Sequence, residues 1–159
     1  TIKQILMKTL LIFVPGEPKA QPRPKARRAG NHVSIYTPAS AKAWKQAIML
    51  QYQGLKPGRQ TQFAKDVALH VELNFHMPRP KSHFLKSGLR HNAPSWHTKR
   101  PDCDNLAKAV LDALQDAQAF HEDSQVALLS VTKQYAKEDD CPGCLIQIYE
   151  MSNNVKKPK

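Results

Sequence analysis

Alternation of apolar and polar residues predicts a sheet of several strands. The clearest run covers 67–75, where every second residue is apolar, a period of two that is typical of a half-buried strand. An apolar run of strand-forming residues covers 8–14, and a short strand is expected at 32–36. Two further strands are expected at 126–135 and 144–151, near the end of the chain.

A first helix is expected to end at about Gln53. Thr37 or Ser40 would cap its start, and Gly54 would end it. The residues of one face recur at helical spacing and should pack on the sheet. They are Trp44, Ala47, Ile48 and Gln51.

A second helix is expected from about Asp104 to Gln115, and its two faces differ in character. The apolar stripe consists of Leu106, Val110, Leu111 and Leu114. The opposite face carries Asp104, Lys108, Asp112 and Gln115, one turn apart each time. The order of elements predicts a single α+β domain, with a mixed or antiparallel β-sheet and two main helices packed on one face.

Two basic, Pro-rich segments interrupt this pattern. Prolines exclude a helix from residues 15–31. Residues 77–101 contain four prolines and no clear period, and a loop of that length inside a compact domain is usually functional or mobile. We expect one domain over 7–151, an N-terminal extension at 1–6 and a basic disordered tail at 152–159.

Charge is the first indication of function. The chain has 159 residues, enough for one domain, and 24 Lys and Arg against 13 acids give a formal net charge of +11. Such an excess favours a polyanionic partner such as nucleic acid. No stretch approaches the roughly 20 apolar residues of a membrane helix, and no long basic amphipathic helix points to a membrane surface. We therefore expect no membrane partner.

The three cysteines do not form a disulfide framework. Cys141 and Cys144 flank Pro142 and Gly143, and such a pair can bind zinc or carry redox chemistry. A zinc site needs two more ligands at a recognisable spacing, which Cys103 and the scattered histidines do not supply. We interpret the pair as turn residues, and reduced cysteines suit a cytoplasmic protein.

Acidic residues gather around the second helix of this basic chain. Asp102 and Asp104 are two positions apart and can point the same way, and Asp123 follows in the pair Glu122-Asp123 just before a strand. Either of the first two aspartates alone is more simply a helix cap, but one cap does not explain all three. Carboxylates held close together repel, and a divalent cation removes that cost. Because Mg²⁺ prefers hard oxygen ligands, the cluster predicts a magnesium site.

Lys108 has two interpretations, which the residues alone leave equally open. It lies one turn after Asp104 and could neutralise charge on a phosphorane-like transition state. It could also be a surface lysine paired with Asp112, which would contribute only about 0.2–0.5 kcal/mol.

The segment PDCDNLAKAVLDAL, followed by EDSQV, resembles the signature of the RusA family of Holliday junction resolvases, which are found in bacteria and often encoded by prophages. That signature is an Asp-x-Asp-Asn-Leu-x-Lys run, an Asp-Ala-Leu, and an acidic pair before Gln and a hydrophobic strand. Spacing and residue types agree over about 25 residues. Weaker likeness includes the Arg-rich loop at 16–28 and the His-Met-Pro at 76–78.

The resemblance implies a crossover junction endodeoxyribonuclease, a phosphodiester hydrolase of DNA recombination and repair. Such an enzyme binds four-way junctions as a homodimer and nicks two opposed strands. Its cofactor is Mg²⁺, for which Mn²⁺ can substitute, and it uses no nucleotide cofactor. The resemblance assigns catalysis to Asp102, Asp104, Lys108 and Asp123, and metal binding to the three aspartates among them.

The chain departs from the family pattern in three places. Glu122 stands where many members have aspartate, and Cys103 where an apolar residue is common. The segment 79–99 is longer than in the shortest members, which affects substrate geometry more than chemistry.

Basic residues of the two loops are the predicted phosphate contacts, which give affinity and salt dependence but little sequence preference. They are Lys19, Arg23, Lys25, Arg27, Arg28, Arg79, Lys81, Lys99 and Arg100. Tyr36, Phe84 and Trp96 could stack on unpaired bases, although local packing is the commoner role of a loop aromatic. Two alternatives stay open: a non-catalytic protein that binds branched DNA, and a nuclease that prefers flaps or forks.

Overall fold

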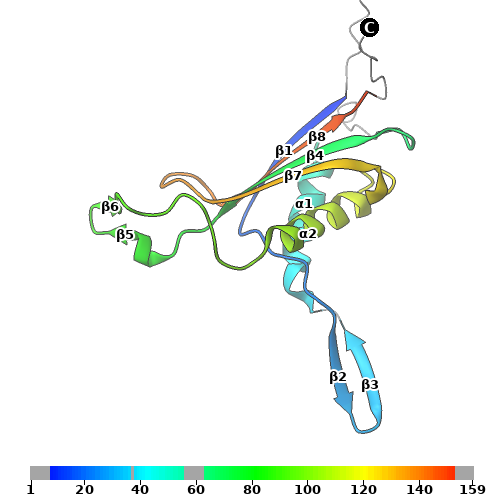
Figure 1. Ribbon diagram of the computed structural model, residues 1–159, viewed down its shortest axis with the longest axis horizontal. Coiled ribbons are helices and arrows are strands. Elements are labelled where there is room, and N and C mark those ends of the chain that lie inside the picture. The colour runs from blue at the N-terminus through cyan, green and yellow to red at the C-terminus, as the bar shows by residue number, and fades with distance from the viewer. Residues whose placement is uncertain (1–7, 37, 56–62, 153–159) are drawn as a thin grey trace, which may run out of the picture.

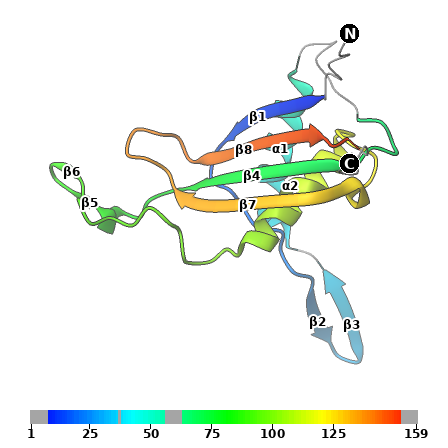
Figure 2. The ribbon, with the colours of Figure 1, turned by 45° about the horizontal axis from the view of Figure 1, so that its top comes forward.

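The computed structural model describes residues 8–36, 38–55 and 63–152, and it confirms the predicted α+β class. Helices α1 (Lys42–Gln53) and α2 (Cys103–Asp116) lie on the same face of a four-stranded sheet (Figure 1). Among the residues described, no helix lies on the opposite face of that sheet (Figure 2). The predicted extension at 1–6 and all but the first residue of the predicted tail lie outside the described residues.

The main sheet is mixed. Its strands are β1 (Thr9–Pro15), β4 (Leu69–Met77), β7 (Val126–Tyr135) and β8 (Gly143–Glu150), in the order β1-β8-β4-β7. Strand β8 runs antiparallel to both of its neighbours, whereas β4 and β7 are parallel. A parallel pair needs a crossover connection, and here that connection is the loop after β4 followed by α2.

Strand β4 shows why this sheet forms. Its burial alternates strictly, with Leu69, Val71 and Leu73 among the fully buried residues and polar residues between them. The predicted alternation is confirmed, but the strand begins two residues later than expected and ends at Met77. Burial of this apolar face against the helices supplies the main stabilisation of the domain.

Helix α1 is preceded by a 3-10 turn over Ala39–Ala41. Ser40 lies inside that turn, and Ala41 is the N-cap residue of α1 without a side-chain cap hydrogen bond, so the predicted Ser40 cap is wrong. Thr37 lies outside the described residues. The buried face of α1 follows four-residue spacing and consists of Trp44, Ile48 and Tyr52.

A two-stranded hairpin projects from the body of the domain (Figure 1, Figure 2). It consists of β2 (Lys25–Ala29) and β3 (His32–Tyr36), joined by a turn in which Gly30 has φ 62°. Strand β3 confirms the prediction, whereas β2 falls in the segment expected to be a loop. Its sequence, Lys-Ala-Arg-Arg-Ala, lacks the apolar alternation by which strands are recognised.

The long segment after β4 projects beyond the end of the sheet and returns to pair with the last residues of β7 (Figure 1). It contains a 3-10 turn (Lys81–His83) and two short strands, β5 (Phe84–Leu85) and β6 (Gly88–Leu89). Trp96 forms an isolated bridge with Gln134 of β7. Backbone hydrogen bonds extend this pairing, from Tyr135 N to Ser95 O (2.9 Å) and from His97 N to Lys133 O (3.3 Å).

The connection between α1 and β4 contains a core residue that belongs to none of the predicted elements. This residue is Phe63, whose side chain is fully buried. Residues 56–62 of that connection lie outside the described residues. No helix in the described part of the chain is long and apolar enough to cross a membrane.

Candidate active site

Helix α2 carries the predicted site residues Asp104 and Lys108, and Asp102 directly precedes it. The helix extends one residue beyond its expected range at each end, and its buried side is broader than the predicted stripe. Leu111 is only partly buried, and alanines complete the inner face. The buried residues are Leu106, Ala107, Ala109, Val110, Ala113 and Leu114. This packing leaves the polar face of α2 directed away from the core.

Asp102 and Asp104 lie at the start of α2, and both side chains are exposed. Asp102 has the extended backbone of an N-cap residue, and its carbonyl oxygen accepts from Leu106 N at 3.1 Å. Its carboxylate, however, makes no cap hydrogen bond. The simpler interpretation of Asp102 as a side-chain cap is therefore wrong, and its carboxylate can face a ligand.

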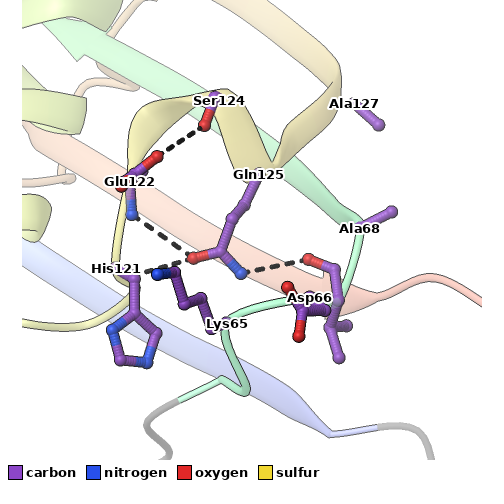
Figure 3. Close-up of a pocket in the computed structure, with 9 residues that line it drawn as sticks. Lys65, Asp66, Ala68, His121, Glu122, Ser124, Gln125 and Ala127 are labelled. Atoms are coloured by element: carbon purple, nitrogen blue, oxygen red, sulfur yellow. Dashed lines mark hydrogen bonds between the residues drawn. The ribbon is translucent and has the colours of Figure 1, made fainter.

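Asp123 begins a 3-10 turn (Asp123–Gln125) that leads into β7. Glu122 is the N-cap residue of this turn and forms a reciprocal capping box with Gln125, and it also accepts from Ser124 Oγ at 3.2 Å (Figure 3). Because Glu122 is used as a cap, the two members of the acidic pair have different roles in the structure.

Gln125 fixes the turn that carries Asp123. Its Oε1 accepts from His121 N (2.9 Å) and Glu122 N (3.3 Å), while its Nε2 donates to Ala64 O (2.8 Å) and Val67 O (3.1 Å). Figure 3 shows this side chain in a pocket of about 370 Å³. None of the predicted site residues lines that pocket.

Lys108 lies between two carboxylates. Its Nζ is 2.8 Å from Asp112 Oδ1 and 3.5 Å from Asp123 Oδ2. On the other side of Asp112, Lys45 of α1 places its Nζ 3.3 Å from Oδ2. The hydrogen bond from Lys108 to Asp112, helped by the charges of both carboxylates and opposed by partial burial, raises the pKa of Lys108. The neighbouring carboxylates therefore favour the protonated, cationic form of Lys108.

The contact between Lys108 and Asp123 places Asp123 beside the polar face of α2. Asp104 lies one turn earlier on that face, about 6 Å along the axis at 1.5 Å per residue. Asp123 is therefore on the same side of the fold as the first two aspartates. In the described parts of the chain, however, no three His, Cys, Asp or Glu side chains are grouped closely enough to hold a metal ion.

A basic pocket adjoins the start of α2. It has a volume of about 460 Å³, and Arg23, Arg100 and Asp102 are among its lining residues. The backbone of Gln21 donates to Asn105 O at 2.9 Å, which ties the loop after β1 to the first turn of α2. Two of the predicted DNA contacts, far apart in sequence, are thus brought to the carboxylate of Asp102.

Lys133 is a residue that the sequence analysis missed. From β7 its Nζ donates to Lys99 O at 2.7 Å and to Pro101 O at 2.6 Å, so it holds the chain directly before Asp102. The sequence of the strand around Lys133 contains no motif that would indicate a function. The two hydrogen-bond partners of Lys133 are 34 and 32 positions away in the sequence. No local signal could have found it.

The other predicted DNA contacts differ in their surroundings. Arg79 is engaged within the protein: it donates to Ala136 O (2.8 Å) and Pro94 O (2.9 Å) and lies 5.2 Å from the ring centroid of Tyr135. Lys19 pairs with Glu17 at 2.7 Å. The remaining candidates outside the basic pocket lie on the hairpin or the long loop: Lys25, Arg27, Arg28, Lys81 and Lys99.

Comparison with known proteins identifies the class of protein that carries this acidic helix and basic pocket. The model of the family described as "Endodeoxyribonuclease RusA" matches residues 15–149, so the chain belongs to the RusA endodeoxyribonuclease family. It is also similar to the uncharacterized protein YqaN of Bacillus subtilis (strain 168). The two are 32% identical over 147 residues, which is 92% of this chain and 99% of YqaN.

Proposed function

We propose that this protein is a Mg²⁺-dependent endodeoxyribonuclease that resolves four-way DNA junctions as a homodimer by paired nicking of opposed strands. Membership of the RusA family supports DNA cleavage as the reaction. The single observation that carries the assignment to these residues is the polar face of α2. There Lys108, one turn after Asp104, contacts Asp123, and the start of the helix adjoins the pocket lined by Arg23, Arg100 and Asp102.

Carboxylate oxygens are the type of ligand that a hard divalent cation prefers. Mg²⁺ usually takes one or two protein carboxylates and completes its coordination with water and phosphate oxygens. Asp102 and Asp104 offer exposed carboxylates, and Asp123 would complete the proposed set, with Mn²⁺ able to substitute. When bound, the ion would polarise the scissile phosphate and lower the pKa of an attacking water.

The residues of the chain have separable tasks in this proposal. Arg23 and Arg100 would hold the phosphates on either side of the scissile bond, because guanidinium groups bind phosphate in a bidentate manner. Lys108, which stays protonated, would stabilise negative charge that develops on the transferred phosphate. Its pairing with Asp123 keeps the ammonium group at the site before DNA arrives.

Four-way junctions are the proposed substrate because a two-fold dimer presents two equivalent sites to a substrate of similar symmetry. A panel of labelled substrates tests this: a four-way junction, a replication fork, a flap and a linear duplex, each with Mg²⁺ and with EDTA. We expect paired nicks in the junction with Mg²⁺ alone. Preferential cutting of flaps or forks, or no cutting of any substrate, would reject the proposed function in favour of one of its alternatives.

Asp104→Asn tests the assignment of the site. The variant should bind the junction as tightly as the wild type but cut it at least about a hundredfold more slowly, since a carboxylate that holds the metal is lost. Asp116→Asn is the matched control, because it changes charge by the same amount at the opposite end of α2 and should cut normally. Sedimentation of the wild-type protein, free and bound to the junction, tests the proposed dimer.

A further inference from the structure

The hairpin β2–β3 is a surface that the proposed chemistry does not use. All ten residues of its two strands are exposed, and it stands away from the main sheet (Figure 2). Two-stranded hairpins are marginally stable in water unless another surface covers them. The hairpin is therefore a candidate surface for binding a partner that would cover its exposed side chains.

The strand register divides the hairpin into two different faces. Lys25 pairs with Tyr36 and Arg27 pairs with Ser34, so these side chains share one polar face. Ala26 pairs with Ile35 and Arg28 pairs with Val33, and these four share the other face. Ile35 is 76% exposed and Val33 is 64% exposed, a high value for β-branched apolar side chains.

The charge of the hairpin restricts what can cover it. Lys25, Arg27 and Arg28 give the hairpin three positive charges, and residues 25–36 contain no acid. A partner must therefore be polyanionic and must also offer apolar surface next to its charges. Intact duplex DNA has the phosphates but hides the faces of its bases within the stack. The centre of a branch exposes base faces beside phosphates, so it offers both.

The position of the hairpin fits this partner. Its first strand begins two residues after Arg23, which lines the basic pocket together with Asp102. Five residues of a strand, at about 3.3 Å each, reach about 16 Å from that pocket. A strand held with its scissile phosphate at α2 would thus have its neighbouring bases alongside the hairpin.

We propose that the apolar side chains of Ala26, Val33 and Ile35 contact bases exposed at the centre of branched DNA, while Arg28 on the same face and Lys25 and Arg27 on the other hold the adjacent backbone. Apolar side chains that contact unstacked bases are a known means of reading distorted DNA. The hairpin would then supply selectivity for branched over linear DNA. This inference rests on the proposed function, because it takes branched DNA to be the substrate.

Binding measurements in EDTA test the inference without any cleavage. The double variant Val33→Thr/Ile35→Thr keeps the β-branched shape and the strand preference but loses apolar surface. We expect it to bind a four-way junction about tenfold more weakly while its affinity for a linear duplex of the same length stays unchanged. The swap Val33→Ile/Ile35→Val is the matched control and should retain the preference for the junction.

A second measurement reports on the bases directly. The fluorescence of 2-aminopurine at the branch centre should change when wild-type protein binds and should change much less with the double threonine variant. Arg27→Gln, on the other face, should weaken binding to junction and duplex alike and reduce the salt dependence of both.

Three results would overturn the inference. They are an equal loss of affinity for junction and duplex, no loss for either, and a lower sedimentation mass of the double threonine variant. The last result would assign the face that carries Val33 and Ile35 to a second copy of this chain. Failure of the wild type to nick DNA, with the difference in binding intact, would instead refute the proposed function and leave the hairpin's role standing.

Discussion

Lys133 holds Pro101 by a hydrogen bond of 2.6 Å from its Nζ to the carbonyl oxygen, and Pro101 immediately precedes Asp102. A second bond of 2.7 Å from the same nitrogen to Lys99 O makes the contact a clamp between β7 and the entrance of α2. Hydrogen bonds from a charged donor are shorter and stronger than neutral ones. The position of Asp102 thus depends on a residue that makes no predicted contact with substrate.

Lys133→Met removes this clamp and keeps most of the side-chain volume. We expect nicking of the junction to slow about tenfold or more, because small displacements of a catalytic group have large effects on rate. Junction affinity should change little, and more Mg²⁺ should be needed for half-maximal rate. Single-turnover rates across a Mg²⁺ series would measure this. Lys137→Met, an exposed lysine just beyond β7, is the control, and an equal effect of both variants would contradict the clamp.

The raised pKa of Lys108 predicts how its contribution to stability depends on pH. A lysine whose pKa is raised in the folded protein stabilises the folded state at pH values below the ordinary lysine pKa of 10.5. This stabilisation disappears as the pH rises through the pKa of the lysine in the folded state. Because half of the Lys108 side chain is exposed, the contribution is at most about 1 kcal/mol.

Urea unfolding of the wild type and of Lys108→Met should therefore differ by a small, constant free energy between about pH 7 and about pH 9. The difference should shrink only at higher pH. A difference that already disappears near neutral pH would show that Lys108 does not stay protonated between its two carboxylates.

Gln125→Glu tests the support of Asp123. The new carboxylate keeps the acceptor for His121 N and Glu122 N but loses the donor to the carbonyl oxygens of Ala64 and Val67. Leaving such groups unpaired should destabilise the protein by about 1–3 kcal/mol. Urea unfolding would measure the loss. Gln118→Glu, a change at an exposed glutamine in the turn after α2, should leave stability nearly unchanged.

The cysteine pair gives a prediction about reactivity. Cys141 is exposed and Cys144 is buried, both thiols are free, and burial raises the pKa of the Cys144 thiol. Because the thiolate is the reactive form, a thiol reagent should modify Cys141 in the native protein and reach Cys144 only after unfolding. Cys141→Ser should remove the fast phase of the reaction. Fast modification of Cys144 in native protein would contradict its burial.

Much of the main sheet could be predicted because its strands obey a simple period. Strand β7 has the predicted bounds, and α2 differs from its prediction by one residue at each end. Strand β2 could not be predicted, since its five residues are all exposed and have no buried face to impose alternation. Phe63 was missed because a single apolar residue in a polar segment has no period at all.

Only those features of the candidate site that lie within one short segment of the chain could be predicted. The spacing of Asp104 and Lys108 follows from helix geometry, and the proximity of Asp123 to Lys108 agrees with the order of the elements. The contacts of Lys133, Gln125 and Arg79 connect segments far apart in sequence. Such contacts depend on tertiary packing, which no short pattern encodes.

The pairing of Trp96 with Gln134 has a consequence for how the protein behaves at high concentration. Strand β7 is the last strand of the sheet, and an uncovered edge offers backbone donors and acceptors to any other chain. The segment from Ser95 to His97 occupies part of that edge with its own backbone. The long loop thus covers the last residues of this edge, and its removal would leave their backbone groups open to pairing with another chain.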